Sequence, residues 1–325
     1  MIDKGDGMRA LGKLSSRTIG VIGLSIVTGI LLLWLQMEEI EPEPQHPVLG
    51  IVSTLAEDQR KDAQMAELIQ TAEQDGFDVL PMPVERTQAS QIEAIRALIV
   101  YQVDVIVFVP LVEDGWENVM HEADTAGIPL LAIDKSMEDS IWGQAKHYVG
   151  YDYCTLAEQA TDALIQHGPS NKGVIELYGT LNSYDAREIA RGCREGLELQ
   201  GKEILYSLCG DGMRSRGYEI MESLQDHLDE IGYVICHNDA MALGALDYLE
   251  ESGRIPGKDV FLCAFGGGED TYDAFKDGRI QVLVQLDDRM LAEKASQAAY
   301  KMIAAPRASF DWIVSGKVLT KGNGA

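Results

Sequence analysis

Short apolar runs alternate along most of the chain with longer stretches in which apolar residues recur at helical spacing. The runs 48–52, 103–109 and 129–133 are continuous and rich in β-branched residues, which is typical of strands buried on both faces of a parallel sheet. Between them, 91–102 and 113–126 place their apolar residues on one helical face. This alternation predicts repeated βα units.

The same pattern restarts after Tyr151. Apolar strand-like runs follow at 173–177, 204–208, 233–236, 260–265 and 281–284, and each of the first four precedes a helical stretch. A spacing of roughly 25–30 residues is that of βα units, so two successive sets predict two doubly wound α/β lobes. Ligands of open α/β sheets bind beyond the carboxyl ends of the strands. The loops of interest therefore follow Ser53, Ile133, Tyr178, Cys209, Cys236 and Phe265.

The first 47 residues differ in kind. Four basic residues precede the uncharged apolar stretch 19–35, and an acidic, Pro-rich spacer follows at 38–44. Basic before and acidic after predicts that the N-terminus stays in the cytoplasm and the remainder lies outside. No pair of small residues follows the apolar stretch, so we expect an uncleaved signal-anchor that holds the protein at the membrane. The alternative is a cleaved signal and a secreted protein.

The composition and the absence of several motifs exclude several classes of function. The chain has 325 residues with 46% apolar side chains, which is typical of a folded protein, and a formal net charge of -25, which argues against nucleic-acid binding. Five dispersed cysteines without C-x-x-C and six scattered histidines give no metal or redox site. Neither a G-x-S-x-G or H-E-x-x-H motif nor a phosphate-binding Walker loop occurs. We therefore predict no enzyme activity and no cofactor.

Several motifs in a fixed order carry a family resemblance. These are 91–96 leading into 103–106, the run 128–135, the run 176–180 before 186–188, and 237–245 with the sequence HNDAMALGA. From about residue 48 to 318 the chain resembles the sugar-binding proteins of bacterial ABC transporters, the ribose and galactofuranose binders especially. The resemblance implies a type I periplasmic binding protein fold, with two parallel-sheet lobes joined by a multi-strand hinge.

The resemblance also implies the domain boundaries. Residues 1–47 would hold the cytoplasmic N-terminus, the signal-anchor and the acidic spacer. The N-terminal lobe would comprise 48–150 and 286–308, and the C-terminal lobe 151–285 and 309–325.

Position by position, the resemblance implies a set of ligand contacts. Asp134 would accept hydrogen bonds from two sugar hydroxyls, and Arg187 would donate a planar fork of N–H groups. Asn238 would both donate and accept. Gln285 matches a ligand-contacting Gln at a crossover between the lobes, and Arg60 lies in the first loop, where galactofuranose binders carry an Arg.

Three positions depart from the family pattern. Lys135 stands where the family usually has Arg, and Gly212 stands where ribose binders have a stacking Phe. Gly266 stands where the family has a sugar-binding Asp and opens the Gly-rich turn 266–268, whose backbone N–H groups would favour an anion. One hypothesis is therefore an acidic or phosphorylated sugar, and the alternative is a neutral monosaccharide.

Simpler interpretations stand beside these roles. Asn238 and Asp239 precede a helical stretch, and either would serve as its N-cap. Asp134 would cap the segment after its strand, and Arg187 would be a solvated surface charge. Trp116 is expected to pack in the core rather than stack on a ligand. Three tyrosines are candidates for stacking on a sugar face: Tyr151, Tyr153 and Tyr184.

The function predicted from these features is that of an extracytoplasmic sugar-binding protein that delivers a monosaccharide to an ABC permease. The alternative is a membrane-anchored sensor that presents its liganded state to a histidine kinase or chemoreceptor. A sugar-responsive repressor is excluded, because the membrane segment stands where such a repressor has its helix-turn-helix domain.

Overall fold

The computed structural model describes residues 27–28, 46–55, 59–142, 145–168 and 171–321. It divides the chain into residues 1–45 and residues 46–325, and the account below concerns the second unit. The predicted membrane segment 19–35 lies outside the described residues except for Val27 and Thr28. Within the residues described, we find no helix with the length and apolar character needed to cross a membrane.

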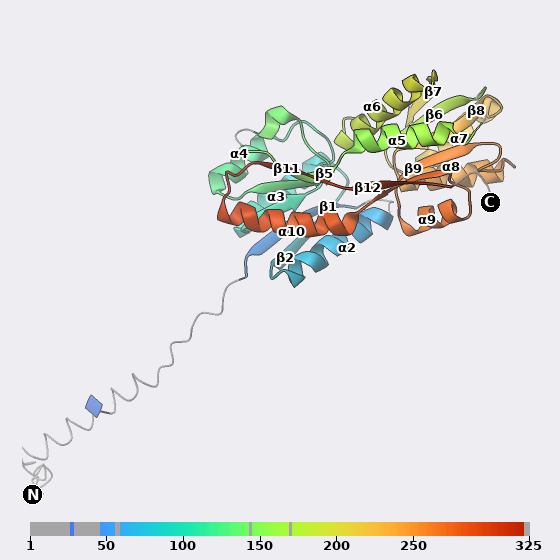
Figure 1. Cartoon of the computed structure of the whole chain (residues 1–325). Helices are drawn as coiled ribbons and strands as arrows, with labels where there is room; N and C mark the ends of the chain where they lie inside the picture. Colours follow the sequence, from blue (N-terminus) through green and yellow to red (C-terminus); the bar gives the residue numbers. More distant parts are fainter. Residues whose placement is uncertain (1–26, 29–45, 56–58, 143–144, 169–170, 322–325) are drawn as a thin grey trace, which may run out of the picture. The chain divides into compact units, whose positions relative to one another are not determined.

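Two six-stranded sheets organise residues 46–325 (Figure 1). The first has the order β11-β5-β4-β3-β1-β2 and all its neighbouring strands are parallel. Its strands are β1 (Val48–Thr54), β2 (Asp78–Val84), β3 (Val105–Phe108), β4 (Leu130–Asp134), β5 (His147–Tyr151) and β11 (Phe310–Val314).

The second sheet has the order β12-β10-β9-β8-β6-β7 and is parallel except for the β10–β12 pair. Its strands are β6 (Gly173–Tyr178), β7 (Ile204–Cys209), β8 (Ile231–Cys236), β9 (Phe261–Gly266), β10 (Val282–Leu286) and β12 (Gly316–Thr320). Two parallel α/β lobes are thus confirmed.

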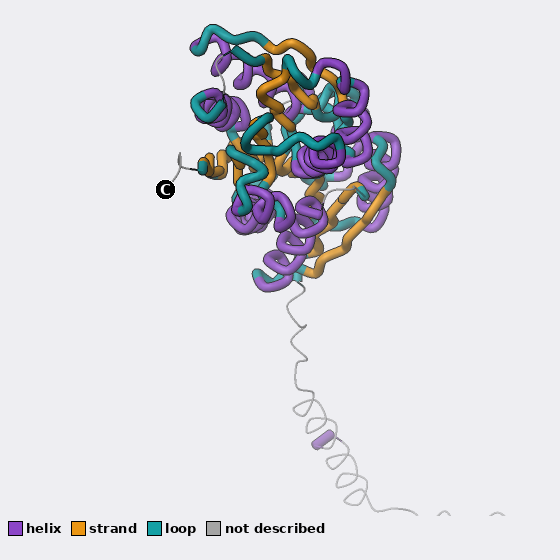
Figure 2. The backbone as a smooth tube through the Cα atoms, turned by 90° about the vertical axis from the view of Figure 1, so that its right-hand side faces the viewer, coloured by secondary structure: helices purple, strands orange, loops and turns teal. Residues whose placement is uncertain are grey.

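Helices cover both faces of each sheet, and in Figure 2 they surround the strands. On the first sheet, α2 (Gln59–Gln74) and α10 (Asp288–Ala304) cover one face, and α3 (Gln88–Tyr101) and α4 (Glu117–Ala126) cover the other. On the second sheet, α5 (Tyr153–Ile165) and α6 (Tyr184–Leu199) lie opposite α7 (Arg214–Ser223), α8 (Asp239–Glu251) and α9 (Glu269–Lys276). Two 3-10 turns complete the elements at Asp139–Trp142 and Gln225–His227.

Two helix starts show how local chemistry sets the boundaries. Helix α3 begins three residues earlier than its apolar pattern, because the Thr87 side chain accepts a hydrogen bond from Ser90 N. Helix α4 begins only after Gly115, whose φ of +77° is incompatible with helix. Trp116 is fully buried in the first lobe's core and its ring packs on Phe108, as expected.

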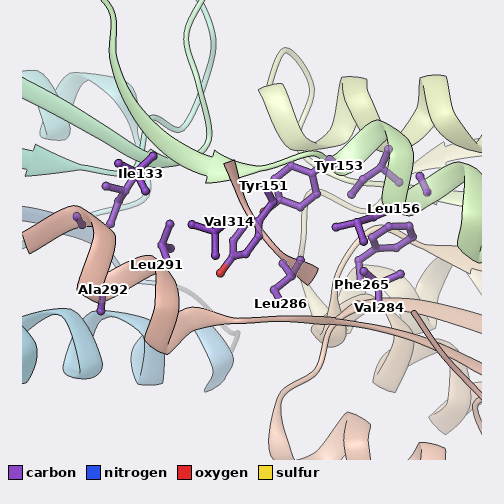
Figure 3. Packing of buried hydrophobic residues seen from close by; sticks show 14 of the residues in the cluster. Ile133, Tyr151, Tyr153, Leu156, Phe265, Val284, Leu286, Leu291, Ala292 and Val314 are labelled. Atoms are coloured by element: carbon purple, nitrogen blue, oxygen red, sulfur yellow. The ribbon is translucent and has the colours of Figure 1, made fainter. Parts of the chain in front are cut away.

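The chain passes three times between the sheets. The passages lie between β5 and α5, between β10 and α10, and between β11 and β12. Figure 3 shows Tyr151, Leu286 and Val314 at these passages, in one apolar cluster that includes residues of both lobes. The resemblance assigned 309–325 to the second lobe, whereas in the structure Phe310–Val314 pairs with β5 of the first sheet and Gly316–Thr320 pairs with β10 of the second.

Candidate functional site

A cavity lies between the lobes, at the carboxyl ends of both sets of parallel strands. About 90 Å³ is open to the centres of water-sized spheres, and one water needs roughly 10–15 Å³ of such space, so the cavity has room for several waters or one small polyol. Five of the six loops singled out from the sequence contribute lining residues, and of the sixth only the preceding strand residue, Phe265, lines the cavity. The lining is Ser53, Thr54, Arg60, Lys61, Gln64, Met65, Arg86, Val109, Pro110, Leu111, Lys135, Tyr153, Gly179, Thr180, Asp185, Gly212, His237, Asn238, Phe265 and Leu286.

Asp134, at the end of β4, anchors the first-lobe wall of the cavity. It is fully buried, and its two carboxylate oxygens accept hydrogen bonds from Lys61 Nζ and from the Tyr153 hydroxyl. Burial alone would raise the pKa of Asp134, but the charges of Lys61 and Arg60 and these two hydrogen bonds hold that pKa well below its usual range. Asp134 is therefore an ionised group that positions two lining side chains.

Lys135 follows directly and crosses to the second lobe. Its Nζ lies 2.9 Å from Asp185 Oδ2, and Asp185 Oδ1 accepts a hydrogen bond of 2.7 Å from the Ser183 hydroxyl. Both members of this ion pair line the cavity. Burial would raise the pKa of Asp185, but the charges of Lys135 and Lys61 and the hydrogen bonds from Lys135 and Ser183 lower that pKa.

Arg86, in the loop after β2, also spans the lobes. Its guanidinium donates to the Asp211 carboxylate at 3.0 Å, to the Asp211 backbone oxygen at 2.7 Å and to Thr180 Oγ1 at 2.6 Å. A Cβ built on Gly212 would lie 3.4 Å from this guanidinium. Arg86 therefore occupies space that a larger side chain at position 212 would need.

In the second lobe, Asn238 both caps the start of helix α8 and lines the cavity. Its Oδ1 accepts a hydrogen bond from Met241 N at the start of α8, and its Nδ2 donates to Gly212 O at 2.9 Å. The two interpretations of Asn238 are thus compatible, because the capping residue also lines the cavity.

His237 lines the cavity beside Asn238, and two contacts fix its imidazole ring. Its Nε2 lies 3.0 Å from the buried Glu176, and Gly179 N donates to its Nδ1 at 3.3 Å. Burial would raise the pKa of Glu176, whereas the hydrogen bond from His237 leads the contacts that lower that pKa. Glu176 therefore fixes the imidazole and, through it, the loop that carries Gly179.

The Gly-rich turn after β9 binds a side-chain carboxylate of the protein itself. Gly267 N and Gly268 N donate to the two carboxylate oxygens of Asp239, at 3.1 and 2.9 Å. The carboxylate lies so close that a Cβ on Gly266 would be 2.2 Å from Asp239 Oδ2. The anion expected at this turn from the sequence is therefore the side chain of Asp239.

The predicted contact residues separate into two groups. Arg60, Lys135 and Asn238 line the cavity. The lining does not include Asp134, Arg187, Gln285 or Gly266.

Arg187 does not line the cavity, and its side chain bridges the two lobes. Its side chain is half exposed and donates a two-fold fork to Glu113, at 2.8 and 2.7 Å. The expected planar fork is present, but in this structure its partner is a carboxylate of the first lobe. Gln285 lies on β10, paired in register with Gly266 on one side and Lys317 on the other.

Of the tyrosines proposed for stacking, Tyr153 lines the cavity. The Tyr151 hydroxyl donates to Asp288 at 3.2 Å, and the Tyr184 ring packs edge-on against Tyr148. Sequence reasoning missed Lys61, Arg86 and Asp185. Lys61 follows the predicted Arg60, so the loop position itself could have indicated it, whereas nothing local distinguishes Arg86 or Asp185 from surface charges.

Comparisons with known proteins match this chain to periplasmic and import binding proteins. The family profile described as "Periplasmic binding protein domain" matches residues 50–306. The galactofuranose-binding protein YtfQ of Escherichia coli is 32% identical over 226 residues, which cover 67% of this chain and 70% of that protein. The ribose import binding protein RbsB of Bacillus subtilis is 26% identical over 228 residues, covering 70% and 72%.

Solved structures agree with the sequence matches. The crystal structure of a galactofuranose binding protein superposes with a TM-score of 0.78 at 27% identity, covering 84% of this chain and 94% of that chain. A Mycobacterium smegmatis protein in complex with β-D-fucofuranose superposes with a TM-score of 0.77 at 26% identity, covering 84% and 91%.

Proposed function

This chain belongs to the periplasmic binding protein domain family, and on that premise we propose that it closes around one neutral monosaccharide and delivers it to an ABC permease. The family is one of substrate-binding proteins rather than enzymes, and it places the binding domain outside the cytoplasm. The relatives named for sugar binding and ribose import support the sugar and the transporter as partners.

The observation that carries this proposal is the cavity between the lobes. Its wall combines hydrogen-bond donors from the first lobe with Asn238, Thr180 and Asp185 from the second, so a bound molecule would contact both lobes at once. A ligand with such contacts favours the closed arrangement by the difference in its affinity for the two states. Polar groups on both walls suit a polyol, since each hydroxyl both donates and accepts.

A neutral ligand is favoured over an acidic one by the charge balance of the wall. The four lining cations each have a carboxylate partner of the protein itself. The pairs are Arg60–Asp288, Lys61–Asp134, Arg86–Asp211 and Lys135–Asp185. Asp239 in turn accepts hydrogen bonds from the Gly-rich turn. An anionic sugar would have to displace one of these carboxylates.

The sensory alternative uses the same closure, with a kinase or chemoreceptor reading the closed shape. The relatives named for import favour transport. The predicted signal-anchor would keep the lobes at the membrane surface in either case.

A thermal-shift screen of residues 46–325 tests the sugar-binding proposal. We expect at least one neutral pentose or hexose to raise the melting temperature, because a ligand that binds only the folded state stabilises it by RT ln(1 + [L]/Kd), about 2.7 kcal/mol at a hundredfold excess over Kd. Galacturonate and glucuronate serve as matched anionic probes beside galactose. A shift with these acids alone would contradict the neutral-ligand proposal, and a flat response to the whole panel would contradict sugar binding.

A further inference from the structure

Asp185 differs in charge from the other charged side chains that line the cavity. Among the described residues that line the cavity, it alone carries a carboxylate, against the cationic side chains of Arg60, Lys61, Arg86 and Lys135. A polyol brings hydroxyl donors as well as acceptors, and a carboxylate is the strongest acceptor a side chain offers them. The wall is rich in donors and has one charged acceptor.

The geometry leaves this carboxylate available to a ligand. Asp185 lies in the first turn of α6, where the helix dipole favours negative charge. Its oxygens accept one hydrogen bond from Ser183 and one ion-pair contact from Lys135, and a carboxylate has about four acceptor sites. Its side chain keeps 21% of its surface exposed, so it is held in place without being sealed off.

The neighbouring carboxylates are committed elsewhere. Both oxygens of Asp134 are engaged by Lys61 and Tyr153, and its side chain has no exposed surface. Glu113 accepts the two-fold fork of Arg187. Neither residue is part of the lining.

Resting on the proposed sugar-binding function, we propose that Asp185 is a specificity-determining ligand contact that accepts hydrogen bonds from one or two sugar hydroxyls. Because Asp185 belongs to the second lobe and Lys135 to the first, a sugar that bonds to this pair is held by both lobes. Recognition of those hydroxyls is thereby coupled to closure.

Titration calorimetry with the sugar found in the screen tests this assignment. We expect Asp185→Asn to weaken binding about 10- to 100-fold, since hydrogen bonds to charged groups contribute that much on average. The matched control is Asp114→Asn. Asp114 also spans the lobes, accepting a 2.7 Å hydrogen bond from Asn182, but it does not line the cavity. This control is expected to stay within threefold of the unchanged protein.

Deoxy sugars separate a direct contact from a structural role. A deoxy analogue that lacks the hydroxyl bound by Asp185 is expected to lose affinity for the unchanged protein and to lose little more for Asp185→Asn. Equal losses for every deoxy analogue in both proteins would overturn the assignment, as would wild-type affinity in Asp185→Asn. If Asp185→Asn does not fold, Asp185→Ser supplies the same comparison.

The two proposals fail separately. If the unchanged protein binds no sugar, the proposed function fails. If it binds a sugar and both Asp185 variants bind that sugar equally well, only the role of Asp185 fails.

Discussion

Asp134→Asn is expected to lower the free energy of unfolding by about 2–3 kcal/mol and to weaken sugar binding at least tenfold. The change keeps the side-chain shape and suits the φ of +65° at this position, which Asn tolerates well. It removes the buried anion that faces Lys61 and Arg60. The cost falls below that of a fully buried pair because the Lys61 side chain is 23% exposed and keeps some contact with water.

Binding weakens in the same variant because Lys61 and Tyr153 both line the cavity and both are held by Asp134. Denaturant unfolding and titration calorimetry measure the two effects. The double variant Lys61→Met/Asp134→Asn is the control, and it should recover part of the stability because no uncompensated cation remains. Unfolding and affinity both unchanged in Asp134→Asn would show that Asp134 does not organise this wall.

Gly266→Ala is expected to lower the free energy of unfolding by about 3 kcal/mol, a drop in Tm of roughly 6–12 °C. The φ of Gly266 is +141°, a conformation that residues with a side chain rarely adopt. Its new Cβ would also displace the Asp239 carboxylate, which accepts hydrogen bonds from Gly267 N and Gly268 N. Strain and two lost charge-assisted hydrogen bonds act together.

Gly127→Ala separates the two causes of that loss. Gly127 has a φ of +74° and its added Cβ would meet nothing within 4 Å, so this variant measures positive-φ strain in open space. We expect it to cost roughly 1 kcal/mol. Scanning calorimetry that gave both variants the same Tm would show that the Asp239 contact contributes nothing.

The elements that the sequence predicted are those with a strong pattern. Strand β3 is buried at all four positions and β4 at all five, and such continuous apolar runs are readable. Strand β2 was missed because it lies at the sheet edge, contains Pro81 and Pro83 and alternates in exposure. Strands β11 and β12 were also missed, and each pairs along one edge only. Strand β5 was missed although it is buried at all five positions, because His147 and Gly150 interrupt its apolar run.

Because the sequence did not predict strand β2, it did not predict that Arg86 contributes to the site. Arg86 follows that strand, so without the strand its loop had no reason to lie at the carboxyl edge of the sheet. The resemblance assigned a fork-like contact to Arg187, and the structure gives that fork to Glu113 instead. Which of two arginines reaches a cavity depends on lobe packing and on the carboxylates nearby. A single sequence does not encode these relationships locally.

The Gly-rich turn 266–268 shows the same limit in another form. Its glycines correctly predict exposed backbone donors, but their acceptor, Asp239, is 28 and 29 residues away from Gly267 and Gly268. Asp239 itself was read only as a candidate cap of the following helix. The anion was therefore expected from a ligand, although the chain supplies it.

A crystal structure with the best-binding sugar of the panel tests the central claim most directly. We expect one monosaccharide between the lobes, in contact with Lys135 from the first and Asn238 from the second. Sugar bound to the outer surface of one lobe, with the cavity holding only water, would contradict the account.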